Sequence, residues 1–429
     1  MQSNKILTRL NDLHPKIIDL SLDRTKTLLK KLNHPENKLQ TVIHVAGTNG
    51  KGSTIAFINE ICERAGLTVN RYTSPHLVNF SERIYVCGQN INELSLTKIL
   101  SECEEVNAGD PITLFEITTA AAFLAFSRTP ADVTLIETGL GGRFDATNVI
   151  EKPTLTIITP ISKDHVNWLG HTLDKIAFEK AGILKTGVPA LIGPQHADAK
   201  LVIEEQAKKL GVKTITYSQD WELSSSLGNI YLRFEKLHSV FPIPSLQGEH
   251  QLTNAATAAI AAKLIKKSEI NDDVIGAGIR STVWPGRLQK LTTTSAKSLP
   301  NGWSLWLDGG HNPGAAEALA TSLSQWQQKP LHIVFAYINS RDPKEFLRPL
   351  AHYIKTLNAI TIPGEASSMS AKECKLAAQQ LGITATISSD FMEAVEKIIK
   401  VSSKPGRILI CGSLYLVGAV LRHEQTKLT

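Results

Sequence analysis

A glycine-rich segment, residues 47–53 with the sequence GTNGKGS, carries the clearest chemical signal in the chain. Glycines allow backbone N–H groups to surround phosphate oxygens, the start of a helix favours a bound anion, and Lys51 supplies a cation. The segment departs from the common phosphate-loop pattern, because Val45 replaces its first glycine and Gly52 separates Lys51 from Ser53. We nevertheless predict a phosphate-binding loop, and the alternative is an ordinary glycine-rich turn.

Three further residues are candidates for binding a divalent cation. Glu137 ends an apolar run and precedes the turn TGLGGR at residues 138–143, which places a carboxylate at the carboxyl edge of a sheet. Oxygen ligands of this kind suit Mg²⁺. His165 follows another β-rich run, although an isolated histidine is more often structural. Ser74 belongs to TSPH, residues 73–76, where Ser-Pro is mostly a turn signal.

The second half of the chain repeats the arrangement of strand, glycine-rich turn and helix at residues 308–313, DGGHNP. In the functional interpretation, Asp308 and His311 face a nucleotide. In the alternative, Asp308 or Asn312 only caps the following helix. Arg287 follows a Pro-Gly pair in the linker before this segment, where it is either a phosphate ligand or a solvated surface residue.

The elements around these motifs indicate an α/β fold. A β-branched run at 41–45 precedes the glycine-rich segment, and a helical pattern follows over 53–65. Further β-rich runs at 133–137 and 154–158 alternate with helical stretches such as 117–126, as in a parallel sheet covered by helices. We predict an N-terminal P-loop-type mononucleotide-binding domain with a mainly parallel sheet.

A second, shorter alternation of strands and helices begins after a polar stretch near residue 290. It predicts a smaller C-terminal doubly wound, Rossmann-like domain, which gives domains at 1–290 and 291–429. The strands expected in this domain are 303–308, 331–337, 359–362, 383–387 and 407–411.

Composition limits the classes of function. The chain has 429 residues and a net charge of +6, but its basic residues are mixed with acidic ones, so we expect no nucleic-acid partner. Its 5 cysteines are scattered and odd in number, which favours neither a disulfide framework nor a zinc site. No apolar leader is visible, and the longest uncharged stretch, 408–421, is too short for a membrane span. We expect a cytoplasmic monomer.

Taken together, the motifs from Asp19 to about Pro313 resemble the folylpolyglutamate synthase/dihydrofolate synthase family, a branch of the Mur ligase superfamily. The resemblance implies an ATP-dependent, amide-bond-forming ligase that activates a carboxylate as an acyl phosphate. The ATP contacts that it implies are Thr48, Asn49, Gly50, Lys51, Asn254, Arg287 and Asp308. The magnesium ligands that it implies are Ser74, Glu137 and His165.

The same resemblance assigns Lys180, in the sequence EKAGI, to the carbamoylated lysine of the family, and it allows a monovalent cation. Lys51, Lys180 and His311 are the catalytic candidates. The expected substrates are dihydropteroate, reduced folates and L-glutamate. The pterin-binding residues that it implies are Asp19, Leu20, Ser21, Leu22, Thr113, Leu114, Phe115, Glu116, Phe144, Asp145 and Ala146.

Two other functions remain open at this point. A nucleotide-regulated, nucleic-acid-binding ATPase requires a clustered basic face with exposed aromatic residues, and the sequence has neither. A Mur-type ligase acting on a cell-wall precursor would use similar phosphate-loop, magnesium and lysine motifs. The pterin-type segments around Asp19 and Asp145 argue against that second alternative.

Overall fold

The computed structural model describes residues 2–14, 19–326 and 328–426, and the chain divides into two compact units. Unit 1 comprises Met1–Ser245 and Leu252–Thr282, and unit 2 comprises Leu246–Gln251 and Val283–Thr429. The chain thus enters unit 2 somewhat before the boundary expected near residue 290. A short upstream segment, 246–251, also belongs to unit 2.

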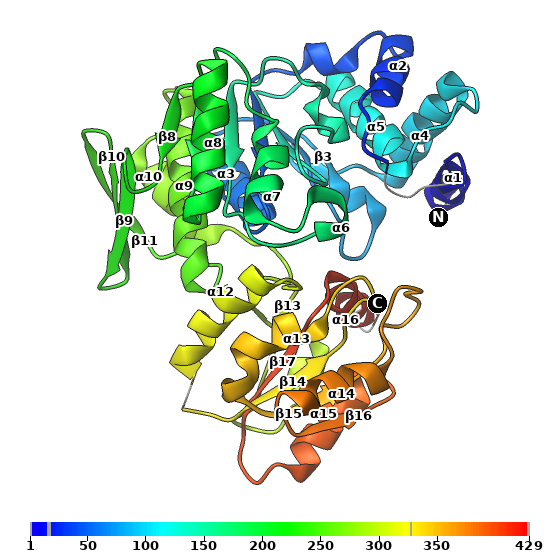
Figure 1. The fold of residues 1–429 in the computed structure, drawn as a ribbon, viewed down its shortest axis with the longest axis vertical. Helices are drawn as coiled ribbons and strands as arrows, with labels where there is room; N and C mark the ends of the chain where they lie inside the picture. The colour runs from blue at the N-terminus through cyan, green and yellow to red at the C-terminus, as the bar shows by residue number, and fades with distance from the viewer. Residues whose placement is uncertain (1, 15–18, 327, 427–429) are drawn as a thin grey trace. The chain divides into compact units, whose positions relative to one another are not determined.

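A sheet forms the centre of unit 1 (Figure 1). It has eight strands in the order β4-β3-β2-β5-β1-β6-β7-β8. The strands from β2 to β8 in this order are parallel, and β3 and β4 add an antiparallel edge. The carboxyl ends of β2, β5, β1 and β6 therefore meet at one edge of the sheet. The bounds are β1 (Val42–Ala46), β2 (Val69–Tyr72), β3 (Ile84–Val86), β4 (Gln89–Asn90), β5 (Val133–Glu137), β6 (Leu155–Ile158), β7 (Ala190–Ile192) and β8 (Thr214–Thr216).

Helices cover both faces of this sheet. α1, α2, α4 and α5 share one apolar core, α7 and α8 pack together over another, and α3 packs against α10. The bounds are α1 (Gln2–Asn11), α2 (Asp23–Lys31), α3 (Lys51–Arg64), α4 (Glu93–Asn107), α5 (Leu114–Arg128), α6 (Val166–Leu169), α7 (Leu173–Ala181), α8 (Ala197–Leu210), α9 (Glu249–Ile265) and α10 (Asp272–Ser281), with short 3₁₀ turns η1 (Pro35–Lys38), η2 (Phe80–Arg83) and η3 (Ala146–Val149).

An additional antiparallel sheet in unit 1 was not expected from the sequence. It consists of β9 (Trp221–Ser226), β10 (Asn229–Phe234) and β11 (Leu237–Pro242), and α10 packs against β11. In β10, Ile230, Leu232 and Phe234 are buried. This alternation is the period-two pattern of a strand with one covered face.

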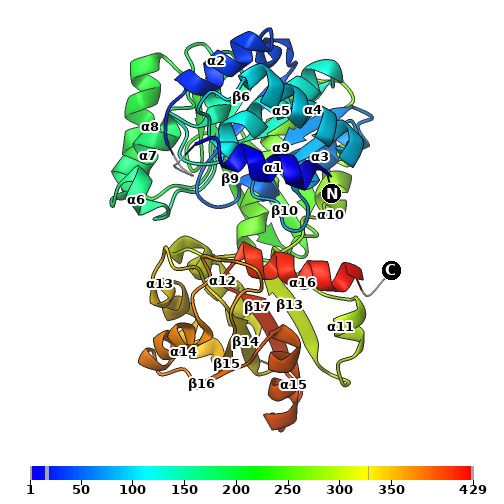
Figure 2. The ribbon, with the colours of Figure 1, turned by 90° about the vertical axis from the view of Figure 1, so that its right-hand side faces the viewer.

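A six-stranded sheet forms the centre of unit 2, in the order β12-β13-β17-β14-β15-β16, with only β12 antiparallel. α12, α13 and α14 lie on one side of it, and α15 and α16 lie on the other (Figure 2). The bounds are β12 (Gln289–Lys290), β13 (Ser304–Asp308), β14 (Leu331–Phe335), β15 (Ile354–Ala359), β16 (Ala385–Ile387), β17 (Arg407–Cys411), α11 (Thr294–Lys297), α12 (Pro313–Leu323), η4 (Ser324–Trp326), α13 (Pro343–Leu347), η5 (Arg348–Tyr353), α14 (Ala371–Gln380), α15 (Phe391–Val401) and α16 (Leu414–Thr426).

The predicted fold class is confirmed, since both units are α/β with mostly parallel sheets. One strand was placed wrongly: residues 359–362 were expected, and the strand is β15, Ile354–Ala359. It was missed because its polar Asn358 is buried, where its Oδ1 accepts hydrogen bonds from Thr386 and Ser388.

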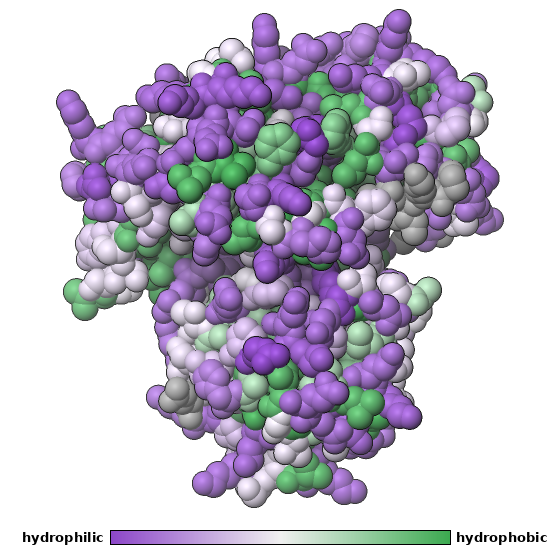
Figure 3. Space-filling view, in the orientation of Figure 1, coloured by the Kyte–Doolittle hydropathy of each residue, from purple (hydrophilic) through white to green (hydrophobic). Residues whose placement is uncertain are grey.

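Hydrophilic residues dominate the face of the protein drawn in Figure 3, and the hydrophobic residues among them are scattered. Within the described ranges, no helix combines the length and the apolar character that crossing a bilayer requires.

Candidate active site

The glycine-rich loop follows β1 directly, and α3 begins at Lys51 with Gly50 as its N-cap. Gly50 has a φ of 89°, a conformation that glycine adopts without strain. The side chain of Asn254 lies against it, because a Cβ on Gly50 would be 2.5 Å from Asn254 Oδ1. The first N–H groups of α3 have no partner within the helix, as at any helix start, so the loop and helix together suit an anion.

Neighbouring segments hold this loop in place. The N–H groups of Thr48 and Asn49 donate to the carbonyl of Pro160, at 3.0 and 3.1 Å. The hydroxyl of Thr48 donates to the carbonyl of Ser162 at 3.0 Å and accepts from its N–H at 3.1 Å. Lys51 Nζ donates to the loop carbonyls of Gly47 and Thr48. The segment after β6 therefore fixes the shape of the loop.

Glu137 lies beside the loop at the end of β5. One carboxylate oxygen is 3.9 Å from Lys51 Nζ, and the other accepts a hydrogen bond of 3.2 Å from the backbone N–H of Ser74. Only 5% of Glu137 is exposed. The structure thus brings together two of the three residues expected to bind magnesium, next to the lysine of the loop.

His165 occupies the turn before α6, with a left-handed φ of 50°. Its imidazole Nε2 is 3.9 Å from the buried carboxylate of Asp164, and 43% of its side chain is exposed. Among the described residues, no group of three or more His, Cys, Asp or Glu side chains is arranged to hold a metal. Magnesium commonly keeps several waters and relies on one or two carboxylates plus phosphate oxygens, so the carboxylate of Glu137 beside the loop fits this ion.

Lys180, on α7, also contacts this loop. Its Nζ donates a hydrogen bond of 2.8 Å to the carbonyl of Gly47, and only 5% of the residue is exposed. Burial, aided by the nearby charge of Lys51, lowers the pKa of Lys180 to about 7, while Asp164 and Asp145 oppose this shift. A substantial fraction of this amine is therefore neutral near pH 7.

Arg24 connects two of the segments expected to bind pterin. It donates to Asp19 Oδ2 at 3.0 Å, to the Asp19 carbonyl at 2.8 Å, and to both carboxylate oxygens of Glu116 at 3.0 and 2.9 Å. Glu116 also accepts from the N–H of Thr113 in a capping box that starts α5. Between these contacts, Leu22 and Leu114 pack against the core, and Ser21 Oγ accepts from the N–H of the residue two positions later.

The buried side chain of Asp145 forms hydrogen bonds within the third segment expected to bind pterin, residues 144–146, and its neighbours. It is 2% exposed, and its carboxylate accepts hydrogen bonds from the N–H groups of Leu140 and Thr147 and from the hydroxyl of Thr147. Burial raises its pKa, although these hydrogen bonds oppose the shift. His44 Nε2 contacts the Thr147 hydroxyl at 2.8 Å, which links the loop to β1. Ala146, the next residue, is buried as well.

Aromatic rings accompany these segments. Phe115 lies against Gly139 so closely that a Cβ there would collide with the ring, and its centroid is 6.1 Å from that of Tyr72. Phe144 is 38% exposed, and the guanidinium of Arg143 lies 4.3 Å from its centroid. The exposed edge of this loop is therefore aromatic, whereas Asp145 points inward.

In unit 2, the carboxylate of Asp308 shapes the turn after β13. One oxygen accepts from the N–H of Leu288 and the other from the N–H of Gly310, both at 2.8 Å. His311 Nδ1 contacts the carbonyl of Gly309 at 3.0 Å. With Nδ1 donating to a carbonyl, Nε2 is the nitrogen that can act as an acceptor.

The helix after this turn is capped as the alternative interpretation expected. Asn312 accepts from the N–H of Ala315 at 2.8 Å, and Pro313 is the first residue of α12. Arg287 Nη1 donates to the carbonyl of Gly286 at 3.1 Å. Capping and ligand binding are compatible here, because the caps leave the side chains of His311 and Arg287 at the carboxyl edge of the sheet.

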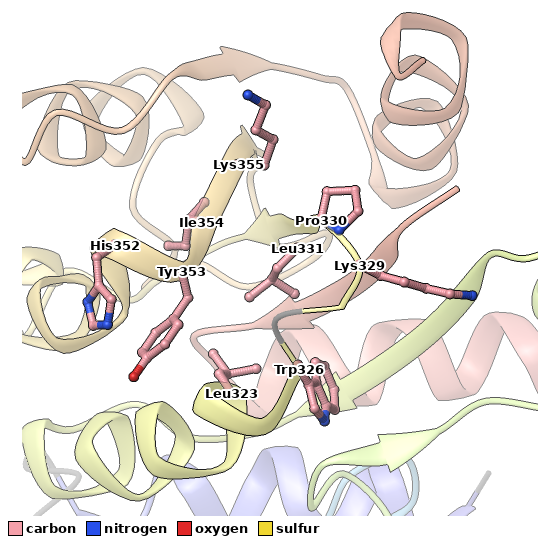
Figure 4. A pocket seen from close by; sticks show the side chains of 9 residues that line it. All are labelled: Leu323, Trp326, Lys329, Pro330, Leu331, His352, Tyr353, Ile354 and Lys355. Atoms are coloured by element: carbon pink, nitrogen blue, oxygen red, sulfur yellow. The ribbon is translucent and has the colours of Figure 1, made fainter. Parts of the chain in front are cut away.

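A cavity of about 340 Å³ lies at the opposite edge of the same sheet, where β14 and β15 begin. Its two lysines do not converge on it: Lys329 Nζ donates to the carbonyl of Gly302, and Lys355 points in another direction (Figure 4). A ligand site normally has converging polar groups, so this cavity is not the candidate site. It is lined by Leu323, Trp326, Lys329, Pro330, Leu331, His352, Tyr353, Ile354 and Lys355.

Known proteins resemble this chain over nearly its whole length. Residues 45–262 match the Mur ligase middle domain, and residues 289–423 match the dihydrofolate synthetase C-terminal domain. A dihydrofolate synthase/folylpolyglutamate synthase of Bacillus subtilis is 34% identical over 425 residues, which cover 94% of each chain. This chain belongs to the dihydrofolate synthase/folylpolyglutamate synthase family. It is therefore an ATP-dependent, amide-bond-forming ligase of the Mur type.

Other members of the dihydrofolate synthase/folylpolyglutamate synthase family agree with this assignment. A dihydrofolate synthetase of Saccharomyces cerevisiae is 31% identical over 430 residues, covering 96% of this chain and 99% of the relative. The structure of Escherichia coli FolC in complex with DHPP and ADP superposes with a TM-score of 0.89 at 28% identity, covering 100% of this chain and 98% of that one. The Yersinia pestis enzyme complexed with AMPPNP and Mn ion gives a TM-score of 0.87 at 29% identity, covering 98% and 97%.

Membership of the dihydrofolate synthase/folylpolyglutamate synthase family argues against one of the alternatives left open by the sequence, a nucleic-acid-binding ATPase.

The sequence analysis missed some residues that hold the predicted site segments in place. Arg24 was not singled out, because its partner Glu116 is 92 positions away in the sequence. Ser162 had no signal of its own, since its role is to hold Thr48.

Proposed function

We propose that this protein joins L-glutamate to dihydropteroate, and to reduced folates, through an acyl phosphate. The observation that carries this proposal is the convergence of Lys51, Glu137 and Lys180 on one glycine-rich loop. The chain also matches folate ligases along nearly its whole length. A relative from Bacillus subtilis bears both synthase names, and a structural neighbour contains DHPP and ADP. Both findings support a pterin acid as the substrate.

The loop residues Thr48 to Lys51 would hold the ATP phosphates, with Asn254 packed beside Gly50. Lys51 is well placed to neutralise charge on the transferred phosphoryl group, because its ammonium already lies at the loop. Arg287 and Asp308 of unit 2 are proposed as further ATP contacts, on the resemblance alone.

Magnesium would be held by Glu137, Ser74 and His165, together with phosphate oxygens. When bound, it would supply Lewis-acid stabilisation of the phosphoryl charge. The fit rests on the buried Glu137 carboxylate, which faces both Lys51 and the Ser74 backbone. A structural neighbour complexed with Mn ion supports the use of a divalent metal.

Lys180 would work as a carbamate formed with CO₂. Carbamate formation requires a neutral amine, and burial lowers the pKa of this amine to about 7. The modification would also replace a second positive charge beside Lys51 with a negative one. A monovalent cation, a cytoplasmic location and a monomeric state stay predictions from the sequence.

The reaction balances as two displacements. The carboxylate of the pterin acid attacks the γ-phosphorus of ATP, and ADP leaves. The amine of L-glutamate then attacks the acyl carbon, and inorganic phosphate leaves as the amide forms. His311 is proposed to position or polarise the acyl group, because its Nδ1 contact with Gly309 fixes the ring in the turn after β13. The pterin would lie along residues 19–22, 113–116 and 144–146.

The test is release of inorganic phosphate from ATP with each acid acceptor in turn. We expect phosphate release that requires both L-glutamate and a pterin acid, with the glutamylated product identified by mass spectrometry. Omission of either substrate and replacement of L-glutamate by D-glutamate are the controls. Turnover with a cell-wall precursor and none with any pterin acid would overturn the proposed substrate.

A further inference from the structure

Arg24 joins two chain segments that are far apart in the sequence. Its three guanidinium nitrogens all donate: Nη1 and Nη2 to the carboxylate and carbonyl of Asp19, and Nε and Nη2 to the carboxylate of Glu116. The Nη1 bond to Asp19 is 3.0 Å long, and the two bonds to Glu116 are 3.0 and 2.9 Å long. His14, which follows α1 in the sequence, adds a contact of 3.4 Å between its Nε2 and the carboxylate of Asp19.

The two carboxylates that Arg24 contacts differ in how far they are exposed to solvent. The Glu116 side chain is 5% exposed and Asp19 is 32% exposed, while Arg24 itself is 22% exposed. Glu116 also fixes the start of α5 by accepting from the N–H of Thr113 at 2.8 Å. A buried carboxylate that loses its charged partner is left poorly solvated, so the contact is a strong geometric constraint.

The planar guanidinium is the feature that makes the connection possible. It presents several donors in fixed directions, so one side chain can hold the carboxylate of Glu116 with two bonds and Asp19 with two more. A lysine ammonium at Arg24 would keep the charge but could not span both partners with the same geometry. The distance between residues 19–22 and 113–116 therefore depends on this side chain.

We propose that Arg24 is a positioning residue for the pterin-acid site, which sets the separation of residues 19–22 from residues 113–116 and so controls affinity for the acid substrate. The proposal rests on the proposed function, because it takes these two segments as the walls of that site. It assigns to Arg24 no contact with the reacting atoms. The nucleotide loop, residues 47–53, shares no contact with this arginine among those described above, so its binding of ATP should be independent.

The test compares Arg24→Lys and Arg24→Met with the wild-type enzyme. We expect KM for dihydropteroate to rise about tenfold or more in both variants, since charged hydrogen bonds to a buried partner are lost, while KM for ATP changes less than about twofold. A purely structural role would lower thermal stability without separating the two KM values. Methylguanidinium added to a third variant, Arg24→Gly, should restore part of the affinity for dihydropteroate.

Arg128 offers a matched control. It forms a bidentate pair with Glu102, at 2.7 and 2.6 Å, and like Glu116 it belongs to α5, but its side chain is 50% exposed and it joins no expected substrate segment. Arg128→Lys should leave both KM values unchanged. If Arg24→Lys also leaves KM for dihydropteroate unchanged, or raises both KM values equally, the proposal is wrong.

A second measurement separates failure of this proposal from failure of the proposed function. If the wild-type enzyme does not turn over pterin acids at all, the proposed function falls. Binding of dihydropteroate, followed by quenching of intrinsic fluorescence, then tests Arg24 without turnover. Equal binding by wild type and Arg24→Met, or no binding by either, would overturn the positioning role as well.

Discussion

The side-chain nitrogen of Lys180 lies 2.8 Å from the carbonyl oxygen of Gly47, the first residue of the glycine-rich loop. Burial lowers the pKa of Lys180, and repulsion from the nearby charge of Lys51 adds to this shift. Because Lys180 contacts a carbonyl of the loop, a change in the chemical state of its amine is expected to affect the shape of the loop.

Lys180→Arg should abolish nearly all ligase activity. Arginine keeps a positive charge but does not readily form a carbamate, so an ammonium role would survive the change in part. The wild-type enzyme should also retain label from ¹³CO₂ by NMR, and the variant should not. Substantial activity in the variant, or an active wild-type preparation without bound label, would contradict the carbamate.

Activity limited by modification of Lys180 should rise with pH through about pH 7. The pKa of this amine is lowered from 10.5 to about 7, so its neutral, CO₂-reactive fraction grows roughly tenfold between pH 6 and pH 8. Between the folded-state pKa of about 7 and the ordinary lysine pKa of 10.5, the folded protein binds fewer protons than the unfolded chain. The free-energy cost of burying Lys180 is therefore smallest at high pH. Lys180→Met should accordingly raise Tm more at pH 6 than at pH 9, in buffers free of CO₂.

Glu137→Gln should lower turnover by more than about tenfold, equivalent to about 1.4 kcal/mol in the barrier. The neutral amide is a poorer magnesium ligand than the carboxylate, while the glycine-rich loop proposed to bind ATP stays intact. Fluorescent nucleotide binding should thus be preserved when phosphate release is lost. Near-normal turnover at saturating magnesium would remove Glu137 from the metal site.

Gly50→Ala should weaken ATP binding, because its φ of 89° is strained for alanine and the new Cβ would lie 2.5 Å from Asn254 Oδ1. Gly66→Ala is the matched control: its φ is 78°, but nothing lies within 4 Å of the added atom. Both variants should lose about 1 kcal/mol of stability from backbone strain. Only Gly50→Ala should raise KM for ATP, as measured by initial rates. Equal KM values for ATP in the two variants would argue against ATP binding at this loop.

Asp145→Ala should raise KM for dihydropteroate and leave KM for ATP nearly unchanged. The sequence suggested a direct contact with the pterin, but the buried carboxylate is bonded to the N–H groups of Leu140 and Thr147. We therefore expect the effect to pass through the shape of the loop and to be accompanied by a lower Tm. A rise in KM for ATP alone would show that the loop serves the nucleotide.

The elements around the glycine-rich loop were predicted well from the sequence, because their signals are local. Gly47 to Ser53 lie between a strand and a helix, and Glu137 ends a strand that was placed with the correct bounds, Val133–Glu137. Parallel strands bring such ends together without any further information.

The remaining parts depend on contacts that no short segment contains. Arg24 meets Glu116 across 92 positions of sequence, and Lys180 meets Gly47 across 133. The sheet of β9, β10 and β11 is a different case, since the alternation of Ile230, Leu232 and Phe234 was visible in the sequence and was not used. β15 was shifted because the burial of its Asn358 depends on partners in a neighbouring segment.

The division of helix α9 between the two units affects how hybrid enzymes can be built from the halves of two relatives. The helix starts at Glu249, and its first turn belongs to unit 2, whereas Asn254 belongs to unit 1 and lies against Gly50. Gln325 donates to the Glu249 carboxylate at 3.0 Å, and Gln251 is fully buried. A fragment cut at Val283 would lack this turn, so a hybrid enzyme has to inherit residues 246–251 from the parent that supplies its C-terminal half.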